Sequence, residues 1–232
     1  MNRKIMSQWI SLPLIAKLCE RITPYLFCMM LSVMTIGLLW GLFYAPADYQ
    51  QGDAFRIIYV HVPSAFLSLM VYSCMAMSAA VFLIWRIKVA DEIARASAPV
   101  GALFTFLALI TGSIWGKPMW GTWWIWDARL TSELILLFLF FGFMALRDAL
   151  PHKIGSIASS YLALIGLINI PIIHFSVIWW NTLHQGPTLS RLAMPSMDSR
   201  MLYPLLLMIL GFTLYYAFIL CVQLQTAMRR RG

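Results

Sequence analysis

Charged residues are scarce in this chain. Asp, Glu, Lys and Arg make up 11% of its 232 residues, whereas hydrophobic residues make up 61% and the mean hydropathy is +0.79. A soluble domain carries about 25% charged residues, so this composition excludes a soluble protein and indicates an integral membrane protein. The net charge of +8 comes from short basic clusters between apolar runs. This pattern is typical of membrane topology and argues against a nucleic-acid-binding face.

Cysteine is also scarce, and its spacing excludes several kinds of site. The four cysteines include no CxxC pair and no CxxCH motif, and all of them lie in or beside apolar segments. A disulfide framework, a zinc site and a covalently attached c-type haem are therefore unsupported. We interpret Cys19, Cys28, Cys74 and Cys221 as small buried hydrophobic residues.

A nucleotide-binding loop is missing as well. The segment Gly112–Pro118 (GSIWGKP) approaches the pattern, but it is one residue short and has Pro where Ser or Thr is needed. The chain therefore has no ATPase motif of its own, and we assign no catalytic residue. We expect a binding and transfer protein, not an enzyme.

Long apolar runs are abundant. A membrane-spanning helix needs about 20 mainly apolar residues, and six segments meet this condition: 22–44, 58–85, 96–116, 130–146, 156–180 and 202–224. We predict an all-α integral membrane protein, with a bundle of six transmembrane helices forming a single membrane domain over residues 1–232. The earlier run from Ile5 to Leu18 either lies on the membrane surface or is disordered.

The distribution of basic residues predicts the orientation of these spans. Twelve of the 17 Lys and Arg residues lie in the two terminal segments and in the loops 86–95 and 147–153. The other three loops hold five. Because basic residues are enriched on the cytoplasmic side, we expect both termini in the cytoplasm. The loop 45–57, the loop between the third and fourth spans and the loop 181–201 then share the outer face.

Tryptophan is concentrated in one of these outer loops. Five of the ten tryptophans fall within twelve residues, at Trp115, Trp120, Trp123, Trp124 and Trp126. One or two would serve as interfacial anchors, but five exceed that need. The Gly and Pro residues among them argue against a regular helix. We therefore predict a shaped aromatic platform on the outer face, suited to a large, flat, apolar ligand with polar groups at one edge.

Two of the four histidines are predicted to flank this platform. His61 precedes Pro63, which disfavours helix at residue 61 and suits a helix start or a kink. His184 follows the fifth span, whereas His174 lies deeper, about 15 Å down the same helix if that helix is regular. His152 is in a cytoplasmic loop. A single interfacial histidine is usually a surface residue, but two beside an aromatic platform indicate axial ligands of haem iron.

Four charged residues near the outer face have both a binding and a structural interpretation. Arg56 and Arg129 are candidates for the haem propionates, although either could be an interfacial anchor, and Arg129 could pair with Glu133 one helical turn on. Asp127 could bind the ligand or cap the fourth span. Glu133 lies near membrane depth, where an acid is a functional candidate by default. Glu133 and His174 receive no assigned role.

The segment Trp115–Asp127 resembles the tryptophan-rich WWD signature of the haem-handling proteins of cytochrome c maturation. The chain's size, its six spans and three further motifs resemble the CcmC family: Ala45–Gln50 (APADYQ), Tyr59–Pro63 (YVHVP) and Trp179–Gly186 (WWNTLHQG). The resemblance covers nearly the whole chain and is weakest before Pro24 and after Ser190.

This resemblance implies a bacterial inner-membrane protein that binds haem b on the periplasmic side. It implies His61 and His184 as the axial ligands and Trp115–Asp127 as the platform. The implied partners are the haem chaperone CcmE, the small membrane protein CcmD and the CcmA/CcmB ABC unit. We expect the protein to present haem to CcmE. The alternatives are a haem-exporting permease subunit, because the family is also described as a haem exporter, and an electron-transfer cytochrome, which would hold haem at depth.

Overall fold

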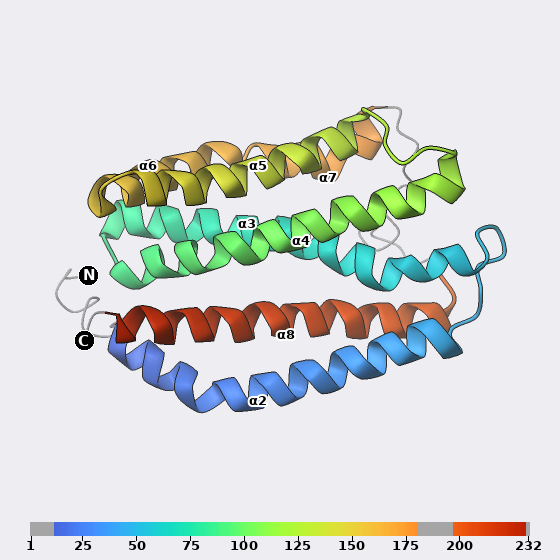
Figure 1. Ribbon diagram of the computed structural model, residues 1–232, viewed down its shortest axis with the longest axis horizontal. Coiled ribbons are helices and arrows are strands. Elements are labelled where there is room, and N and C mark those ends of the chain that lie inside the picture. The colour runs from blue at the N-terminus through green and yellow to red at the C-terminus, as the bar shows by residue number, and fades with distance from the viewer. Residues whose placement is uncertain (1–11, 181–196, 231–232) are drawn as a thin grey trace.

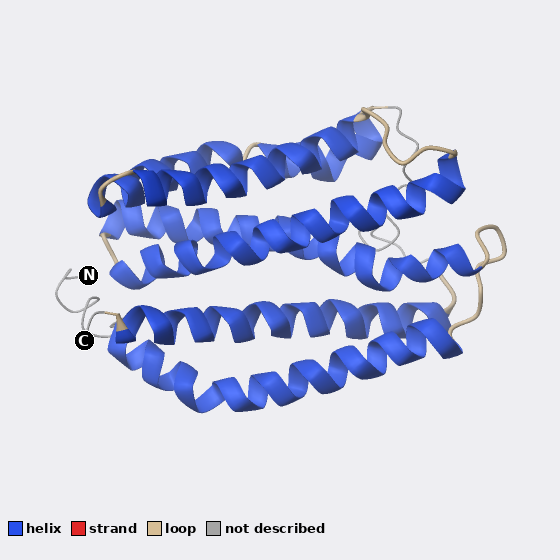
Figure 2. Cartoon of the chain, viewed as in Figure 1, coloured by secondary structure: helices blue, strands red, loops and turns tan. Residues whose placement is uncertain are grey.

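The computed structural model describes residues 12–180 and 197–230 and is built from helices (Figures 1 and 2). Six helical stretches are long and apolar enough to cross a membrane: Leu12–Tyr44, Asp53–Trp85, Lys88–Trp120, Ala128–Ala149, His152–Trp179 and Ser199–Arg229. The prediction of six spans in an all-α membrane protein is therefore confirmed.

Several stretches contain more than one helical element. The first consists of α2 (Leu12–Leu39) and a π-helical turn, η1 (Trp40–Tyr44). The second consists of a 3₁₀ turn, η2 (Asp53–Ile57), and α3 (Ile58–Trp85). The remaining elements are α4 (Lys88–Trp120), α5 (Ala128–Ala149), α6 (His152–Gly166), α7 (Asn169–Trp179) and α8 (Ser199–Arg229).

Two of the spans begin earlier than the sequence predicts. Helix α2 is described from Leu12, so residues 12–18 are helical and continuous with the first spanning stretch, while residues 5–11 of the predicted surface or disordered run lie outside the described residues. Helix α4 starts at Lys88, which leaves only Arg86 and Ile87 as the connection from α3. The first turns of α4 were missed in the sequence because they contain acidic and basic residues. These residues lower the local hydropathy, and hydropathy does not show that a charged side chain has a partner on another helix.

The fifth span is two helices, not one. Helix α6 ends at Gly166 and α7 begins at Asn169. Pro171 lies in the first turn of α7, where a missing backbone N–H costs no intrahelical hydrogen bond, whereas within a continuous helix it would break the ladder. Helix α7 ends at Trp179, and Trp180 is extended. The span predicted over 156–180 is therefore present as His152–Trp179, but it is not one regular helix.

The helices form three layers. From bottom to top in Figure 1, these are the α2–α8 pair, the α3–α4 pair, and α5 with α6 and α7. Helix α4 touches α3, α5 and α8 and is the most buried of the six spans. Its buried positions are mainly small residues, including Ala94, Ala98, Gly101 and Ala102. Small residues allow close approach of helices in a membrane, where packing replaces the hydrophobic effect between helices.

The connections divide the bundle into two ends. Helix α2 begins and α8 ends at one end, where the α3–α4 and α5–α6 connections also lie; we call this the basic end. The opposite end holds residues 45–52, residues 121–127 and the start of α8; we call it the tryptophan end. The sequence motifs with proposed chemistry gather at the tryptophan end.

Candidate functional site at the tryptophan end

His61 lies on α3 with its ring against α4. Its Nδ1 is 3.1 Å from the carbonyl oxygen of Ala108 and 3.0 Å from Oγ1 of Thr111. A carbonyl oxygen can only accept a hydrogen bond, so Nδ1 carries the proton and donates. In the neutral ring the lone pair is then on Nε2, the atom that can coordinate a metal. Gly112 permits this approach, because a Cβ there would lie 3.1 Å from Cε1 of the imidazole.

The expectation that Pro63 would disfavour helix at residue 61 is wrong. Helix α3 begins at Ile58 and continues through both His61 and Pro63. A 3₁₀ turn, η2, precedes this first part of α3. The Ser64 hydroxyl donates a hydrogen bond to the Val60 carbonyl over 2.7 Å, within the same part of the helix. His61 therefore sits on a regular helix, whose packing on α4 holds its position.

Trp115, the first tryptophan of the signature, contacts His61. The two rings meet edge to face, with centroids 5.6 Å apart and planes at 77°. Trp115 Nε1 donates to Oε1 of Gln51 over 2.8 Å, and the Phe55 ring lies 6.3 Å away on the other side. The structure thus brings together residues from the 45–52 connection, η2, α3 and α4. Sequence reasoning missed Gln51 and Thr111, for which spacing supplies no signal.

The tryptophan segment is half helix and half irregular chain. Helix α4 continues through Gly116 and Pro118 to Trp120, so the prediction of no regular helix is wrong for this half. The Trp120 ring packs where Gly116 lacks a side chain, because a Cβ there would lie 2.9 Å from its Cε3. Gly121, at φ +77°, ends the helix in the left-handed conformation that favours glycine.

Residues 121–127 place three tryptophan rings in different environments. The side chains of Trp123 and Trp126 are 57% and 75% exposed. Trp124 is half-buried against the core, and its ring meets the Trp126 ring edge to face with centroids 5.4 Å apart. Its buried Nε1 has no hydrogen-bond partner in the described part of the chain. Trp124 therefore anchors the segment, while Trp123 and Trp126 present apolar surface outward.

Asp127 is the N-cap of α5. Its Oδ1 accepts a hydrogen bond from the Leu130 backbone N–H over 2.8 Å, so the structural interpretation of this residue is confirmed. A carboxylate at this place also interacts favourably with the positive end of the helix dipole. The cap fixes where the tryptophan segment stops and α5 begins.

Arg129 and Glu133 contact other helices and do not form an ion pair with each other in the described residues. The guanidinium of Arg129 donates to the Ile173 carbonyl on α7 over 3.3 Å. The buried carboxylate of Glu133 accepts from the Ser68 hydroxyl of α3 over 2.8 Å. The suggested pairing at i,i+4 is therefore not the arrangement observed, and Glu133 links α5 to α3 within the bundle.

Arg56 and Arg200, two further arginines of the tryptophan end, already have protein partners. Arg56 forms an ion pair with Asp53, with Nε 2.9 Å from Oδ1, and donates to the Gly41 carbonyl over 2.8 Å. Arg200 pairs with Asp198, the N-cap of α8, over 2.8 Å. The hydrogen bond from the Arg200 side chain lowers the pKa of Asp198. Arg56 therefore links the second span to the first; its interpretation as an interfacial anchor stays a prediction.

No described contact joins His174 or His152 to the His61–Trp115 pair. His174 is exposed on α7, beside the stacked rings of Phe175 and Trp179, whose centroids are 5.2 Å apart. His152 is exposed at the basic end. His184 lies outside the described residues, as does most of the Trp179–Gly186 motif. Helix α7, which carries His174, ends at Trp179.

Comparisons with known proteins identify the chain's relatives. The model of the CcmC family, described as Heme exporter protein C, matches residues 5–232. Heme exporter protein C of Haemophilus influenzae is 51% identical over 89% of this chain and 85% of its own length. The protein of the same name from Escherichia coli is 51% identical over 88% and 83%. A ccmC-like mitochondrial protein of cytochrome c biosynthesis from Marchantia polymorpha is 48% identical over 80% and 78%.

Proposed function

Because the chain belongs to the Heme exporter protein C family, we propose that it binds haem b at the tryptophan end and presents it for cytochrome c maturation. The observation that carries this proposal is the environment of His61. Its Nδ1 is tied to Ala108 and Thr111, which leaves the lone pair on Nε2. A histidine held in this way is prepared to coordinate iron.

The tryptophan segment fits the apolar part of such a ligand. Trp115 contacts His61, and Trp123 and Trp126 expose more than half of their surface. Aromatic side chains offer a large apolar contact area with a polar N–H at one edge. We propose that these rings, together with Trp120 and Trp124, hold the edge of the macrocycle and leave it accessible to a chaperone.

The second axial ligand and the propionate partners belong to the same proposal. We assign the second ligand to His184. Arg129 is the stronger candidate for a propionate, because its one described hydrogen bond, at 3.3 Å, is long. To bind a propionate, Arg56 would have to give up its contacts with Asp53 and with the Gly41 carbonyl. Asp127 contributes to the site by fixing the end of the tryptophan segment.

The location and partners of the site follow from the charge pattern and the family. We propose that the basic end faces the cytoplasm and the tryptophan end faces the periplasm across a bacterial inner membrane. The receiving protein would be the haem chaperone CcmE, and CcmD and the CcmA/CcmB ABC unit would complete the assembly. We propose that energy from ATP comes from that unit, because this chain contains no nucleotide-binding loop.

A permease is the second candidate function, and two observations favour it. The fifth span is interrupted between α6 and α7, and discontinuous helices are typical of transporter binding sites. Polar contacts also cross the bundle there, since Asn169 donates to the Ser132 carbonyl over 2.9 Å and Glu133 accepts from Ser68. These contacts are satisfied within the protein, so they also serve as interhelical packing.

The ligand assignment is tested with purified full-length protein. We expect His61→Ala and His184→Ala each to weaken haem binding or change the haem absorption spectrum, with partial recovery on adding imidazole. His174→Ala and His152→Ala are the matched controls, because both side chains are exposed and neither has a described contact with His61 or Trp115. Loss of the haem spectrum in His174→Ala, with His61→Ala and His184→Ala unchanged, would show the assignment to be wrong.

Presentation and export are separated by a second experiment. Replacing Trp120, Trp123, Trp124 and Trp126 together with alanine should reduce haem attached to the chaperone more than haem retained on this protein. Trp85→Ala is the control, because that ring is 46% exposed and ends α3 at the basic end. Both haem pools are measured in the same cells. Normal chaperone loading in the fourfold variant would rule out presentation and favour the permease.

A further inference from the structure

The basic end carries a cavity that the proposed function does not use. It has a volume of about 560 Å³ and lies between the α3–α4 connection and the first turns of α6. Its walls include the apolar side chains of Phe82 and Ile157 and the basic side chains of Arg86, Lys88 and Lys153. The size lies within the range of small-molecule sites, and the lining suits a ligand that is apolar at one end and anionic at the other.

The lining of this cavity carries more basic than acidic side chains. Asp91 is the one acidic residue in the lining, and it is already neutralised. Its Oδ1 accepts from Nη1 of Arg147 over 2.6 Å, and its Oδ2 accepts from Nη2 of Arg147 over 3.0 Å and from the Ser156 hydroxyl over 3.1 Å. Both side chains of this ion pair are buried. The three basic residues therefore form no ion pair within the described residues.

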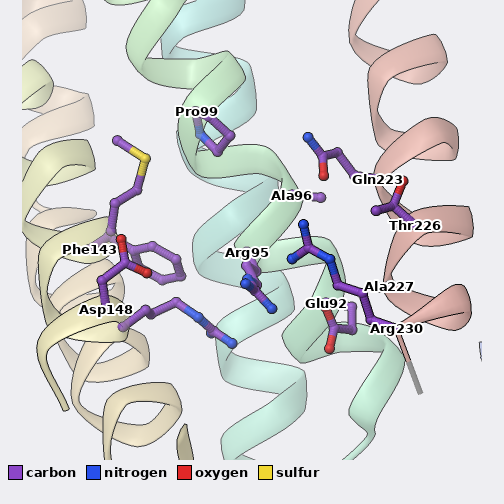
Figure 3. A pocket seen from close by; sticks show the side chains of 12 residues that line it. Glu92, Arg95, Ala96, Pro99, Phe143, Asp148, Gln223, Thr226, Ala227 and Arg230 are labelled. Atoms are coloured by element: carbon purple, nitrogen blue, oxygen red, sulfur yellow. The ribbon is translucent and has the colours of Figure 1, made fainter. Parts of the chain in front are cut away.

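A neighbouring cavity shows a different charge balance. Figure 3 shows this second space, of about 180 Å³, where Arg95 and Arg230 approach Glu92 between α4 and α8 while Asp148 lies on the α5 side. Two carboxylates offset the arginines there, so it has less attraction for an anion. The buried Asp91–Arg147 pair separates the two spaces, with Asp91 in the lining of the larger one and Arg147 in that of the smaller.

A metal ion is a poor occupant for the same region. Asp91, Glu92 and His152 have potential ligand atoms within 4.8 Å of one another. Both oxygens of Asp91 are bound by the Arg147 guanidinium, however, and a metal would have to displace that cation from a buried site. The Arg147 guanidinium already supplies the positive charge beside Asp91. The charged groups that remain to bind a ligand are the basic side chains that line the larger cavity.

The backbone directs Arg86 into this cavity. Arg86 ends α3 in the left-handed conformation, with φ 58° and ψ 33°, and its N–H donates to the Phe82 carbonyl over 2.8 Å. Its guanidinium lies over the Phe82 ring, 5.7 Å from the centroid. An arginine held against an aromatic wall keeps its charge at the rim while its stem covers apolar surface.

The two helices that border the cavity, α3 and α6, also expose apolar side chains. Ile154, Tyr161 and Ile165 are exposed at near-helical spacing on α6, the same helix whose first turns form the cavity wall. Ile84 and Trp85 are exposed at the end of α3 beside Arg86. In a membrane-spanning bundle, such surfaces face acyl chains, and a basic cavity at the helix ends lies at the level of the headgroups.

We propose that this cavity binds the phosphate of an anionic phospholipid. Arg86, Lys88 and Lys153 contact the headgroup phosphate, and the acyl chains run along α6 from Ile157 toward the membrane centre. A bound lipid would neutralise the three basic side chains and bridge the α3–α4 connection to α6. The ligand is distinguished from free phosphate by its acyl chains and from a zwitterionic lipid by its net charge.

The proposal is tested by titrating the purified full-length chain in detergent with phosphatidylglycerol and, separately, with phosphatidylcholine. Lipids retained by the protein are counted by native mass spectrometry. We expect one phosphatidylglycerol to bind in preference to phosphatidylcholine. The combined variant Arg86→Gln, Lys88→Gln, Lys153→Gln should weaken that binding on the order of 100-fold, since each basic side chain near a membrane surface contributes about fivefold.

The matched control replaces Arg95, Arg229 and Arg230 with glutamine, which removes the same charge from the same end of the bundle but leaves the larger cavity intact. It should retain wild-type preference for phosphatidylglycerol. Equal weakening in both variants, or none in either, would overturn the proposal.

If the combined variant fails to fold, Lys153→Gln alone tests the site, because that side chain is exposed. About fivefold weaker binding of phosphatidylglycerol is expected, and unchanged binding contradicts the site. Displacement of the lipid by millimolar inorganic phosphate would show that the ligand is free phosphate.

Discussion

At the scale of single residues, the histidines of this protein differ in what holds them. His61 is fixed by two hydrogen-bond acceptors from α4 and by an edge-to-face contact with Trp115. His174 is exposed on α7, and its described ring contact is with the adjacent Phe175. Coordination strength depends on a defined tautomer and ring orientation, which outer hydrogen bonds provide. The same side chain is thus prepared for ligation at position 61 and not at position 174.

Thr111 should therefore affect haem affinity although it need not touch haem. Its Oγ1 donates to the Leu107 carbonyl and accepts from His61 Nδ1 over 3.0 Å. We expect Thr111→Val to weaken haem binding about tenfold, the lower end of the usual effect of losing an outer hydrogen bond. Haem titration followed by absorbance measures the affinity and reports the axial ligands.

Thr105→Val provides the matched control for this change. Thr105 is also on α4 and buried, and its hydroxyl donates to the Gly101 carbonyl without reaching a histidine. It should leave haem affinity unchanged. Equal losses in the two variants would mean that Thr111 acts through packing of α4 and not through His61.

At the scale of helices, small residues on α4 decide how closely its neighbours approach. Gly101 faces Phe140 of α5, and a Cβ at Gly101 would lie 2.1 Å from Cζ of that ring. The Phe140 ring could not move away easily, because it is fully buried in the core cluster that joins α3, α4 and α5. This contact sets the separation of α4 and α5 and hence the position from which the tryptophan segment departs.

Gly101→Ala should accordingly destabilise the bundle. Overpacking a closely packed core costs about 1–3 kcal/mol, which thermal unfolding in detergent would show as a lower midpoint. Gly142→Ala on α5 is the control, since its nearest neighbour is the flexible Cδ2 of Leu162 at 3.1 Å. Adding Phe140→Leu should recover part of the loss in Gly101→Ala. An unchanged midpoint in Gly101→Ala alone would contradict this account of the α4–α5 contact.

At the scale of the whole molecule, the six spans place the two kinds of chemistry at opposite ends. The buried Asp91–Arg147 pair and the basic cavity lie at one end, and the His61–Trp115 contact lies at the other. A ligand site at the tryptophan end and a lipid site at the basic end would therefore lie on different sides of the membrane. Their separation means that each can be altered without direct contact with the other.

The orientation of the molecule predicts which end is accessible from outside the cell. A cysteine introduced at Met119, which is 37% exposed at the end of α4, should react with a membrane-impermeant reagent in spheroplasts whose inner membrane is intact. A cysteine introduced at Lys153 should react only after the membrane is opened. The reverse labelling pattern would show that the basic end faces outward, contrary to the charge distribution.

Sequence patterning predicted the elements better than their ends. Six apolar runs were sufficient for six spans, because a bilayer requires a minimum helix length from every chain that crosses it. The second predicted span, 58–85, coincides with α3. The early start of α4 was missed because Asp91 is tolerated there only through Arg147, which comes from a different helix.

The residue types of the proposed site were also visible in the sequence, since clustered tryptophans and an aspartate before an apolar run are local signals. The capping role of Asp127 needed only local information, and it is confirmed. The roles of Arg129 and Glu133 depended on Ile173 and Ser68, which belong to other helices. No spacing along the chain indicates such partners.

The amino-acid sequence by itself therefore determined the membrane class, the number of spans, the family and the cluster of tryptophans. These properties depend on composition, on run length and on residues close together in the chain. Only the tertiary structure decided which nitrogen of His61 carries the proton, where the tryptophan segment leaves the helix, and which acid neutralises which base. Those outcomes depend on distances between helices, and these distances are set by side-chain packing such as that of Phe140 on Gly101.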